Sequence, residues 1–170
     1  MKKKVVELLG RVKDKTNIFE FNNINDSLLV ELNLKKELSF VDVGSGLCEL
    51  VNFINSKNNN IKITCIDINY EFVKLSASYD YKSVNAEITK LPIINDSFDV
   101  THCSHVIEHL GYPAIIQGID ELIRITKPGG IIIIRTPLWA NHRFYNDIDH
   151  IRPYPPDALL NYFFNKQQQK

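Results

Sequence analysis

The sequence predicts an α/β fold in which a mostly parallel sheet carries helices on both faces. Strand-like apolar runs alternate with helical patterns over about a hundred residues, which is the arrangement that builds parallel sheets. Two of these runs end on an acid, Asp42 and Asp67, and the first leads directly into Gly44-Ser45-Gly46. A strand, a tight glycine turn and a helix in succession present backbone N–H groups at the carboxyl end of the strand.

Length and composition indicate one soluble globular domain. The chain has 170 residues, of which 44% are hydrophobic and 24% charged, enough for a single core. The formal net charge is zero, so no nucleic-acid partner is indicated. No apolar run approaches the ~18–20 residues that span a bilayer, and no signal-peptide pattern opens the chain. The three scattered cysteines suit a reducing compartment, and we expect a cytoplasmic protein.

Each expected element follows from local periodicity. Residues 1–39 are expected to be mostly helical, with one helix ending near Thr16 and a second running from a cap at Asn25 or Asp26 to Leu34. After the strand that enters the glycine turn, the expected strands are 61–67, 81–86, 96–104 and 131–136. The expected later helices are 47–56, 69–78, 107–110, 113–125 and one beginning at Pro155. Residues 127–130 are expected to form a tight turn.

The two acids at the strand ends indicate what the glycine turn binds. Glu49 stands where a dinucleotide fingerprint wants glycine or alanine, and its carboxylate would oppose a pyrophosphate at the helix N-terminus. A cationic ligand without phosphate suits Asp42 better; a plain connecting loop is the alternative. Asp67 follows the turn by about the 20 residues that place a carboxylate on ribose hydroxyls, although it could instead cap the next helix.

Four ordered segments resemble the class I methyltransferases that use S-adenosylmethionine. The resemblance implies a Rossmann-like sheet and a single domain, with an N-terminal helical segment (1–39), a cofactor-binding core (40–137), and a substrate loop with a terminal helix (138–170). The family has seven strands, and this chain is expected to lack the last two. The matching segments are 41–46, 66–67, 87–92 with 96–99, and 122–130.

The resemblance also implies roles for individual residues. The glycine turn would hold the methionine part of S-adenosylmethionine, Asp67 the ribose, and Cys103 and Ser104 would border the sulfonium and the substrate. Where the family often has a third glycine this chain has Cys48, whose side chain is expected to narrow the approach to the backbone. The implied cofactor-binding residues are Asp42, Gly44, Ser45, Gly46, Asp67, Ile68, Glu87, Ile88, Cys103 and Ser104.

The polar, aromatic stretch 137–154 is expected to bind the methyl acceptor. It follows the fifth strand, and it resembles the corresponding loop of methyltransferases that act on small molecules and on saccharide or lipid-linked precursors. His142, Tyr145, Asp147 and His150 are candidates for a base, which is needed only if the acceptor must lose a proton. His150 has an alternative role, in which it anchors the loop by a hydrogen bond.

Two further motifs match the signatures of other enzyme classes. Residues 105–109 spell H-x-x-E-H, a zinc peptidase pattern, but such a site needs a third ligand and the only later glutamate is Glu121. We therefore expect no metal there. Residues 70–74 spell the Y-x-x-x-K pair of reductases, but they lie just after the second strand and are read as a surface helix.

The short C-terminus leaves two matters open. Without the last two strands, the apolar fifth strand would be a sheet edge, which is unfavourable. We expect the terminal helix, the N-terminal segment or a second copy of the chain to cover it. A catalytically silent binding or regulatory module is the main alternative to an active methyltransferase, and an NAD-type reductase is the third.

Overall fold

A six-stranded sheet forms the centre of the computed structural model, which describes residues 7–11, 37–57, 60–137 and 142–168. The strand order is β1-β6-β5-β2-β3-β4. All neighbouring strands pair in parallel except β1, which is antiparallel to β6. The strands are β1 (Glu7–Arg11), β2 (Leu38–Val43), β3 (Ile61–Asp67), β4 (Lys82–Asn85), β5 (Phe98–Ser104) and β6 (Thr126–Arg135).

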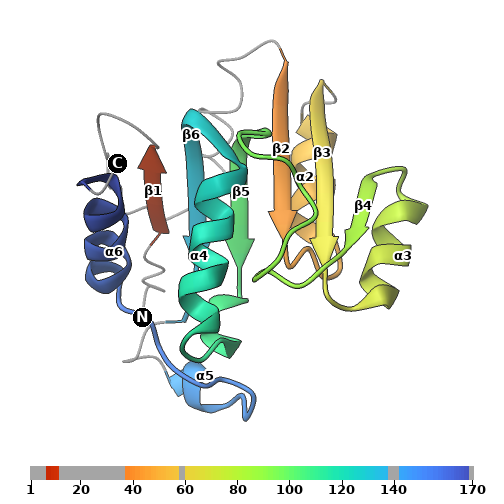
Figure 1. The fold of residues 1–170 in the computed structure, drawn as a ribbon. Coiled ribbons are helices and arrows are strands. Elements are labelled where there is room, and N and C mark those ends of the chain that lie inside the picture. The colour runs from red at the N-terminus through yellow and green to blue at the C-terminus, as the bar shows by residue number, and fades with distance from the viewer. Residues whose placement is uncertain (1–6, 12–36, 58–59, 138–141, 169–170) are drawn as a thin grey trace.

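Helices cover both faces of this sheet, as the alternating pattern predicts (Figure 1). Among the described residues, no helix is long and apolar enough to cross a bilayer. The α-helices are α2 (Glu49–Lys57), α3 (Tyr70–Ser78), α4 (Ala114–Ile125), α5 (His142–Tyr145) and α6 (Pro156–Gln168), and η1 (Ile107–His109) is a single 3₁₀ turn.

The two faces of the sheet belong to two separate apolar clusters. Alternate residues of a strand point to opposite faces, so Phe40 packs in the cluster that contains Val51 and Ile54 of α2. Val41 packs in the other, with the buried residues of α4 and with Leu159 of α6. The carboxyl ends of the parallel strands are thereby held at one edge of a two-sided core, which is where α/β proteins build their sites.

Local signals placed several elements correctly. The helix expected from Asn69 is present as α3, and Asn69 caps it, with its side-chain Oδ1 accepting a hydrogen bond of 2.9 Å from the backbone N–H of Glu71. The third expected strand is present as β4, and Pro156 lies in the first turn of α6. The expected helix at 107–110 is only the single turn η1.

The expectation of a helix at residues 7–11 is wrong: they form β1, whose Leu8 lies opposite Ile134 in the pairing register. The same pairing confirms that the fifth expected strand, β6, is covered, and it is the N-terminal segment that covers it. The second expected helix, 25–34, lies outside the described residues.

The predicted tight turn at 127–130 belongs instead to β6, which begins at Thr126 and joins β5 through an irregularity between Phe98 and Val100. Close packing explains why Gly130 is there: a Cβ atom on it would lie 2.9 Å from the carbonyl oxygen of Asp99. Near this start of the strands, Lys127 Nζ also lies 2.8 Å from Asp99 Oδ2. The starts of β5 and β6 are therefore held together by protein contacts.

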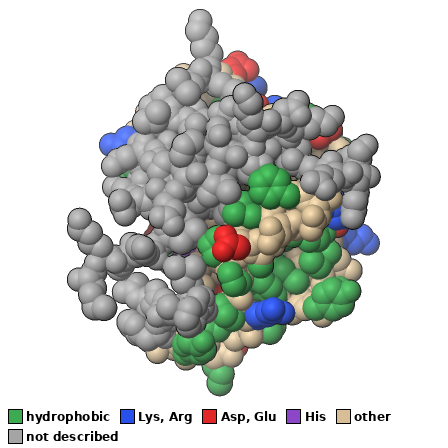
Figure 2. Space-filling model, turned by 90° about the vertical axis from the view of Figure 1, so that its left-hand side faces the viewer, with side chains coloured by type: hydrophobic (Ala, Val, Ile, Leu, Met, Phe, Trp, Pro, Cys, Tyr) green, Lys and Arg blue, Asp and Glu red, His purple; other side chains and the backbone are tan. Residues whose placement is uncertain are grey.

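The surface on the α6 side of the molecule is rich in apolar side chains, with few charges among them in the part that the structure describes (Figure 2). Phe164 of α6 is 41% exposed. This side lies beside β1, away from the glycine turn (Figure 1).

Candidate active site

The glycine turn after β2 is tied to the end of β3 by three hydrogen bonds. The backbone N–H groups of Gly44 and Ser45 donate to the carbonyl of Ile66, at 2.8 and 3.2 Å. The N–H of Gly46 donates to Oδ2 of Asp67 at 2.9 Å. The two carboxyl ends that the sequence singled out are therefore in direct contact, and the Asp67 carboxylate faces the turn.

The two glycines of this turn serve different purposes. Both have positive φ, 79° at Gly44 and 48° at Gly46, a conformation that glycine adopts without steric cost. A Cβ on Gly44 would lie 2.2 Å from Cγ2 of Val106, whereas a Cβ on Gly46 would meet nothing within 4 Å. Gly44 thus makes room for a protein side chain, and Gly46 presents bare backbone to open space.

Cys48 does not narrow the approach to this backbone, contrary to the expectation. Its φ is 62°, in the left-handed region where the family often has glycine. Its side chain is fully buried in the apolar cluster beneath the turn, together with Cys65. Desolvation raises the pKa of the Cys48 thiol, so it remains protonated at neutral pH and behaves as a small apolar side chain.

Asp67 forms hydrogen bonds both with the glycine turn and with the segment that follows β4. Its Oδ1 accepts a hydrogen bond of 2.8 Å from the N–H of Asn69, and its carbonyl accepts one of 3.1 Å from the N–H of Ala86. The side-chain amide of Asn85 also bonds the carbonyls of Asp67 and Ile68, both at 2.9 Å. Glu87, two positions after Asn85, is exposed, while Ile88 is buried in the core.

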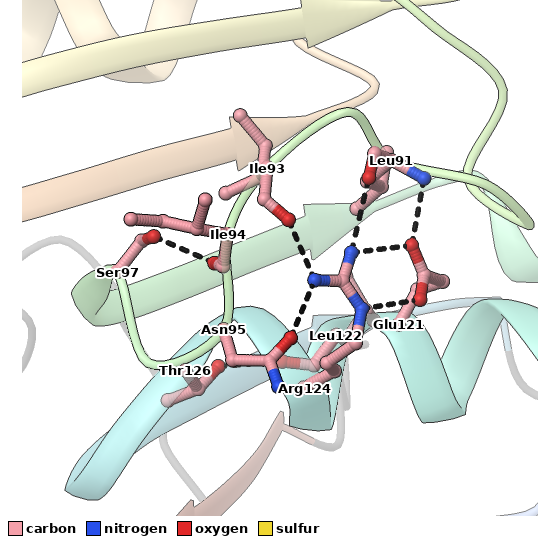
Figure 3. A network of polar contacts seen from close by, with 9 residues as sticks. All are labelled: Leu91, Ile93, Ile94, Asn95, Ser97, Glu121, Leu122, Arg124 and Thr126. Atoms are coloured by element: carbon pink, nitrogen blue, oxygen red, sulfur yellow. Dashed lines mark hydrogen bonds and ion pairs between the residues drawn. The ribbon is translucent and has the colours of Figure 1, made fainter.

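A clamp of polar side chains fixes the loop that follows Ile88. The guanidinium of Arg124 bonds both carboxylate oxygens of Glu121, at 2.6 and 2.7 Å, and reaches the carbonyls of Leu91 and Ile93, at 3.0 and 2.6 Å (Figure 3). It also bonds Oδ1 of Asn95 at 2.9 Å. The bond from Arg124 lowers the pKa of Glu121. The clamp holds this loop against α4 and so fixes the far end of the segment that carries Glu87.

Asp42 and Cys103 lie deeper than their expected roles suggest. Oδ1 of Asp42 lies 2.7 Å from Nδ1 of His102, and both side chains are almost fully buried between β2 and β5. Cys103 has no exposed surface, and burial raises the pKa of its thiol well above the ordinary value. Ser104, the next residue, is half-buried at the end of β5. Of the two β5 residues, Ser104 is the one that reaches the edge.

The segment expected to bind the acceptor is docked beside η1. The N–H of Ile151 donates to the carbonyl of Glu108 at 2.9 Å, and Nδ1 of His150 donates to the carbonyl of Phe144 at 2.8 Å. His150 therefore makes the anchoring bond that was its alternative role. Tyr145 is 70% exposed; the backbone of His142 lies in α5, and its side chain is outside the described part.

The sequence argument missed three residues around the site. Val106 fills the space over Gly44, Arg124 organises the clamp, and Glu108 is fully buried beside His105, whose Nδ1 lies 3.1 Å from Oε1 of Glu108. The H-x-x-E-H spacing was a usable signal for Glu108. No local pattern indicates Val106, because its contact Gly44 lies far away in the sequence. Glu121 is a local partner of Arg124, but the carbonyls of Leu91 and Ile93 that Arg124 also bonds are distant in the sequence.

Comparisons with known proteins agree with this geometry. A family model described as a methyltransferase domain matches residues 41–134. An uncharacterized methyltransferase of Mycolicibacterium vanbaalenii is 39% identical over 56 residues, which cover 33% of this chain and 21% of the relative. A demethylmenaquinone methyltransferase of Clavibacter sepedonicus is 43% identical over 51 residues, covering 30% of this chain and 20% of that protein. The matches thus span about a fifth of these relatives.

Solved structures share the fold. The crystal structure of a SAM-dependent methyltransferase from Archaeoglobus fulgidus superimposes with a TM-score of 0.69 at 18% identity, covering 85% of this chain and 66% of that one. This likeness confirms the predicted Rossmann-like α/β fold. The family model, which spans more than half of the chain, confirms the predicted family: this chain belongs to the methyltransferase-domain family.

Proposed function

We propose that this chain transfers a methyl group from S-adenosylmethionine to a small-molecule or glycan-type acceptor. The observation that carries the proposal is the contact between the N–H of Gly46 and the carboxylate of Asp67. This contact joins the exposed backbone of the glycine turn to an acid, at the carboxyl ends of two adjacent parallel strands. The chain that carries it belongs to the methyltransferase-domain family.

The residues at this edge fit S-adenosylmethionine. Each oxygen of Asp67 accepts one backbone hydrogen bond, and a carboxylate oxygen can accept two, so capacity remains for both ribose hydroxyls. Leu47 and Ile68 flank the turn with 60% and 70% of their surface exposed, an apolar surface that an adenosine could cover. Glu87 supplies an exposed acceptor for an adenine amino group.

Positioning is the chain's main contribution to the reaction. S-adenosylmethionine, when bound, supplies an electrophilic methyl group on a sulfonium. Ser104 borders the path of that methyl group, and the segment from α5 to Ile151 orients the acceptor. Holding the acceptor atom in line at ~3 Å provides most of the acceleration. Where the acceptor must lose a proton, Tyr145, His142 or Asp147 takes it, and His150 keeps the segment in place.

A turnover assay tests this proposal. The purified chain is incubated with S-adenosylmethionine and a panel of hydroxylated small molecules, saccharides and lipid-linked saccharides, and release of S-adenosylhomocysteine is followed. We expect release that depends on one class of acceptor and falls in Tyr145→Phe or His142→Ala if either residue is the base. Cofactor binding without turnover on any acceptor would instead identify a binding module. Failure to bind S-adenosylhomocysteine, together with binding of a nicotinamide dinucleotide, would favour a reductase.

A further inference from the structure

Three side chains that can bind a metal converge under the segment expected to receive the acceptor. They are Glu108 and His109 of η1 and His150, and one ligand atom from each lies within 4.8 Å of the others. We propose that they form a binding site for a divalent transition-metal ion of the zinc type. This inference does not depend on methyl transfer.

Both histidines are oriented as metal ligands are. Nδ1 of His109 lies 3.2 Å from the carbonyl oxygen of Asp149, and Nδ1 of His150 lies 2.8 Å from that of Phe144. A carbonyl oxygen only accepts, so each Nδ1 carries the hydrogen and a neutral ring has its lone pair on Nε2. Histidines that bind metals usually donate their other N–H to a carbonyl or carboxylate in this way.

Glu108 provides an independent indication of a missing cation. Its side chain has no exposed surface. Oε1 accepts a hydrogen bond from His105, but Oε2 is buried without a hydrogen-bond partner among the described residues. A desolvated carboxylate oxygen without a partner is costly, and a bound cation beside it would remove that cost.

The set of donor atoms indicates the class of ion. Two imidazole nitrogens and a carboxylate suit zinc and its transition-metal neighbours better than magnesium or calcium, which prefer oxygen ligands. Oδ2 of Asp147 lies 3.7 Å from Nε2 of His150, and this carboxylate is half-exposed. Asp147 is therefore available as a further ligand at the mouth of the site.

This arrangement supplies the ligand that the H-x-x-E-H motif lacked. The third ligand is His150, 41 positions after His109, and His105 supports Glu108 through its hydrogen bond. An ion held here would join η1 to the acceptor-binding segment, which backbone bonds from Ile151 and Arg152 to the carbonyl of Glu108 already hold together. The metal would thus fix the position of that segment beside η1.

Metal binding can be measured on the tag-free chain after treatment with a chelator. The chain is dialysed to equilibrium against Zn²⁺, and separately against Co²⁺, and bound metal is quantified by elemental analysis. We expect one ion per chain. Each of His109→Gln, His150→Gln and Glu108→Gln should weaken binding by about 100-fold or more, since loss of a ligand costs more than loss of its supporting residue. The matched control Glu121→Gln should leave the affinity unchanged.

Thermal unfolding of the metal-free variants separates loss of a ligand from loss of the fold. If Glu108→Gln fails to fold, His109→Gln decides the matter, because the His109 ring is only half-buried. Absence of bound metal in the unsubstituted chain would overturn the proposal. So would binding that survives His109→Gln and His150→Gln, or that is lost only with His142→Ala, because the ion would then lie elsewhere.

Discussion

Two glutamates of this chain, the half-buried Glu121 and the fully buried Glu108, have opposite hydrogen-bonding environments. The carboxylate of Glu121 receives both Nε and a terminal nitrogen of Arg124, and its Oε2 also accepts the N–H of Leu91 at 2.7 Å. The carboxylate of Glu108 receives one hydrogen bond, from His105, and leaves Oε2 buried without a partner in the described part of the chain. Glu108 follows the carboxyl end of β5, whereas Glu121 lies on α4 beside the loop that leads into β5.

The difference in hydrogen bonding between Glu121 and Glu108 separates a structural network from a candidate binding site. Where polar groups satisfy one another completely, as around Arg124, the network fixes a loop and has no capacity for a ligand. Where a buried group is left unsatisfied, the missing partner is a candidate ligand. The following substitutions test this contrast from the largest expected effect on folding to the smallest.

Arg124→Ala should have the largest effect on stability. It removes both hydrogen bonds from Arg124 to Glu121 and the donor of the Leu91 and Ile93 carbonyls, and we expect a loss of about 2–4 kcal/mol in the free energy of unfolding. Chemical denaturation provides the measurement. Lys74→Ala removes an exposed ion pair with Glu71 and should cost less than about 0.5 kcal/mol. Equal losses in the two variants would contradict the contrast.

Gly44→Ala should come next. The added Cβ would overlap Val106 and also place a side chain at positive φ, which together should cost about 2–3 kcal/mol. Gly46→Ala, where the added atom meets nothing, should cost only about 1 kcal/mol from backbone strain. Val106→Ala combined with Gly44→Ala should recover part of the loss, and no recovery would show that Val106 is not the obstacle.

The same substitution at the two glutamates compares the networks directly. Glu121→Gln removes a charge that two hydrogen bonds from Arg124 stabilise, and should cost about 1–3 kcal/mol. In metal-free protein, Glu108→Gln keeps the acceptor for His105 and should cost less than about 1 kcal/mol. A larger loss at Glu108 than at Glu121 would mean that Glu108 belongs to the scaffold.

The smallest expected effect is a change with pH in the stabilisation that Glu121 provides. Arg124 lowers the pKa of Glu121 below its ordinary 4.5, so the folded chain holds this group's proton less tightly than the unfolded chain does. The stabilisation is therefore complete above the unfolded pKa and is lost as the pH falls through the folded pKa. The gap in unfolding free energy between the unsubstituted chain and Glu121→Gln should narrow from pH 7 towards pH 3. A gap that widens on acidification would reverse the assigned sign.

Local sequence predicted the elements whose cause is local. The strands that carry Asp42 and Asp67 near their carboxyl ends, the helix after Asn69 and the helix after Pro155 all have their signals within a few residues. The strand β1 was missed because its apolar residues allow helix or strand, and pairing with the distant β6 decides between them. The irregular start of β6 was predicted as a turn because the reason for Gly130 is not local in the sequence. A Cβ atom on Gly130 would lie too close to the carbonyl oxygen of Asp99.

The residues of the candidate site also differ in whether their signals are local in the sequence. The glycine turn and Asp67 were found because their spacing is itself the signal. The meeting of His150 with Glu108 depends on how a loop docks 40 residues away, which spacing does not encode. The motif at 105–109 contains Glu108 and His109 of the proposed metal site, and the proximity of His150 to them is seen only in the structure.

The role of Asp67 in cofactor binding is tested by calorimetric titration of S-adenosylhomocysteine into the chain and into Asp67→Asn, with Asp80→Asn at an exposed turn as the matched control. We expect one binding site in the unsubstituted chain, an affinity at least about 10-fold lower in Asp67→Asn because a charge-assisted hydrogen bond is lost, and no change in Asp80→Asn. No binding to the unsubstituted chain, or equal affinity in all three proteins, would contradict this role.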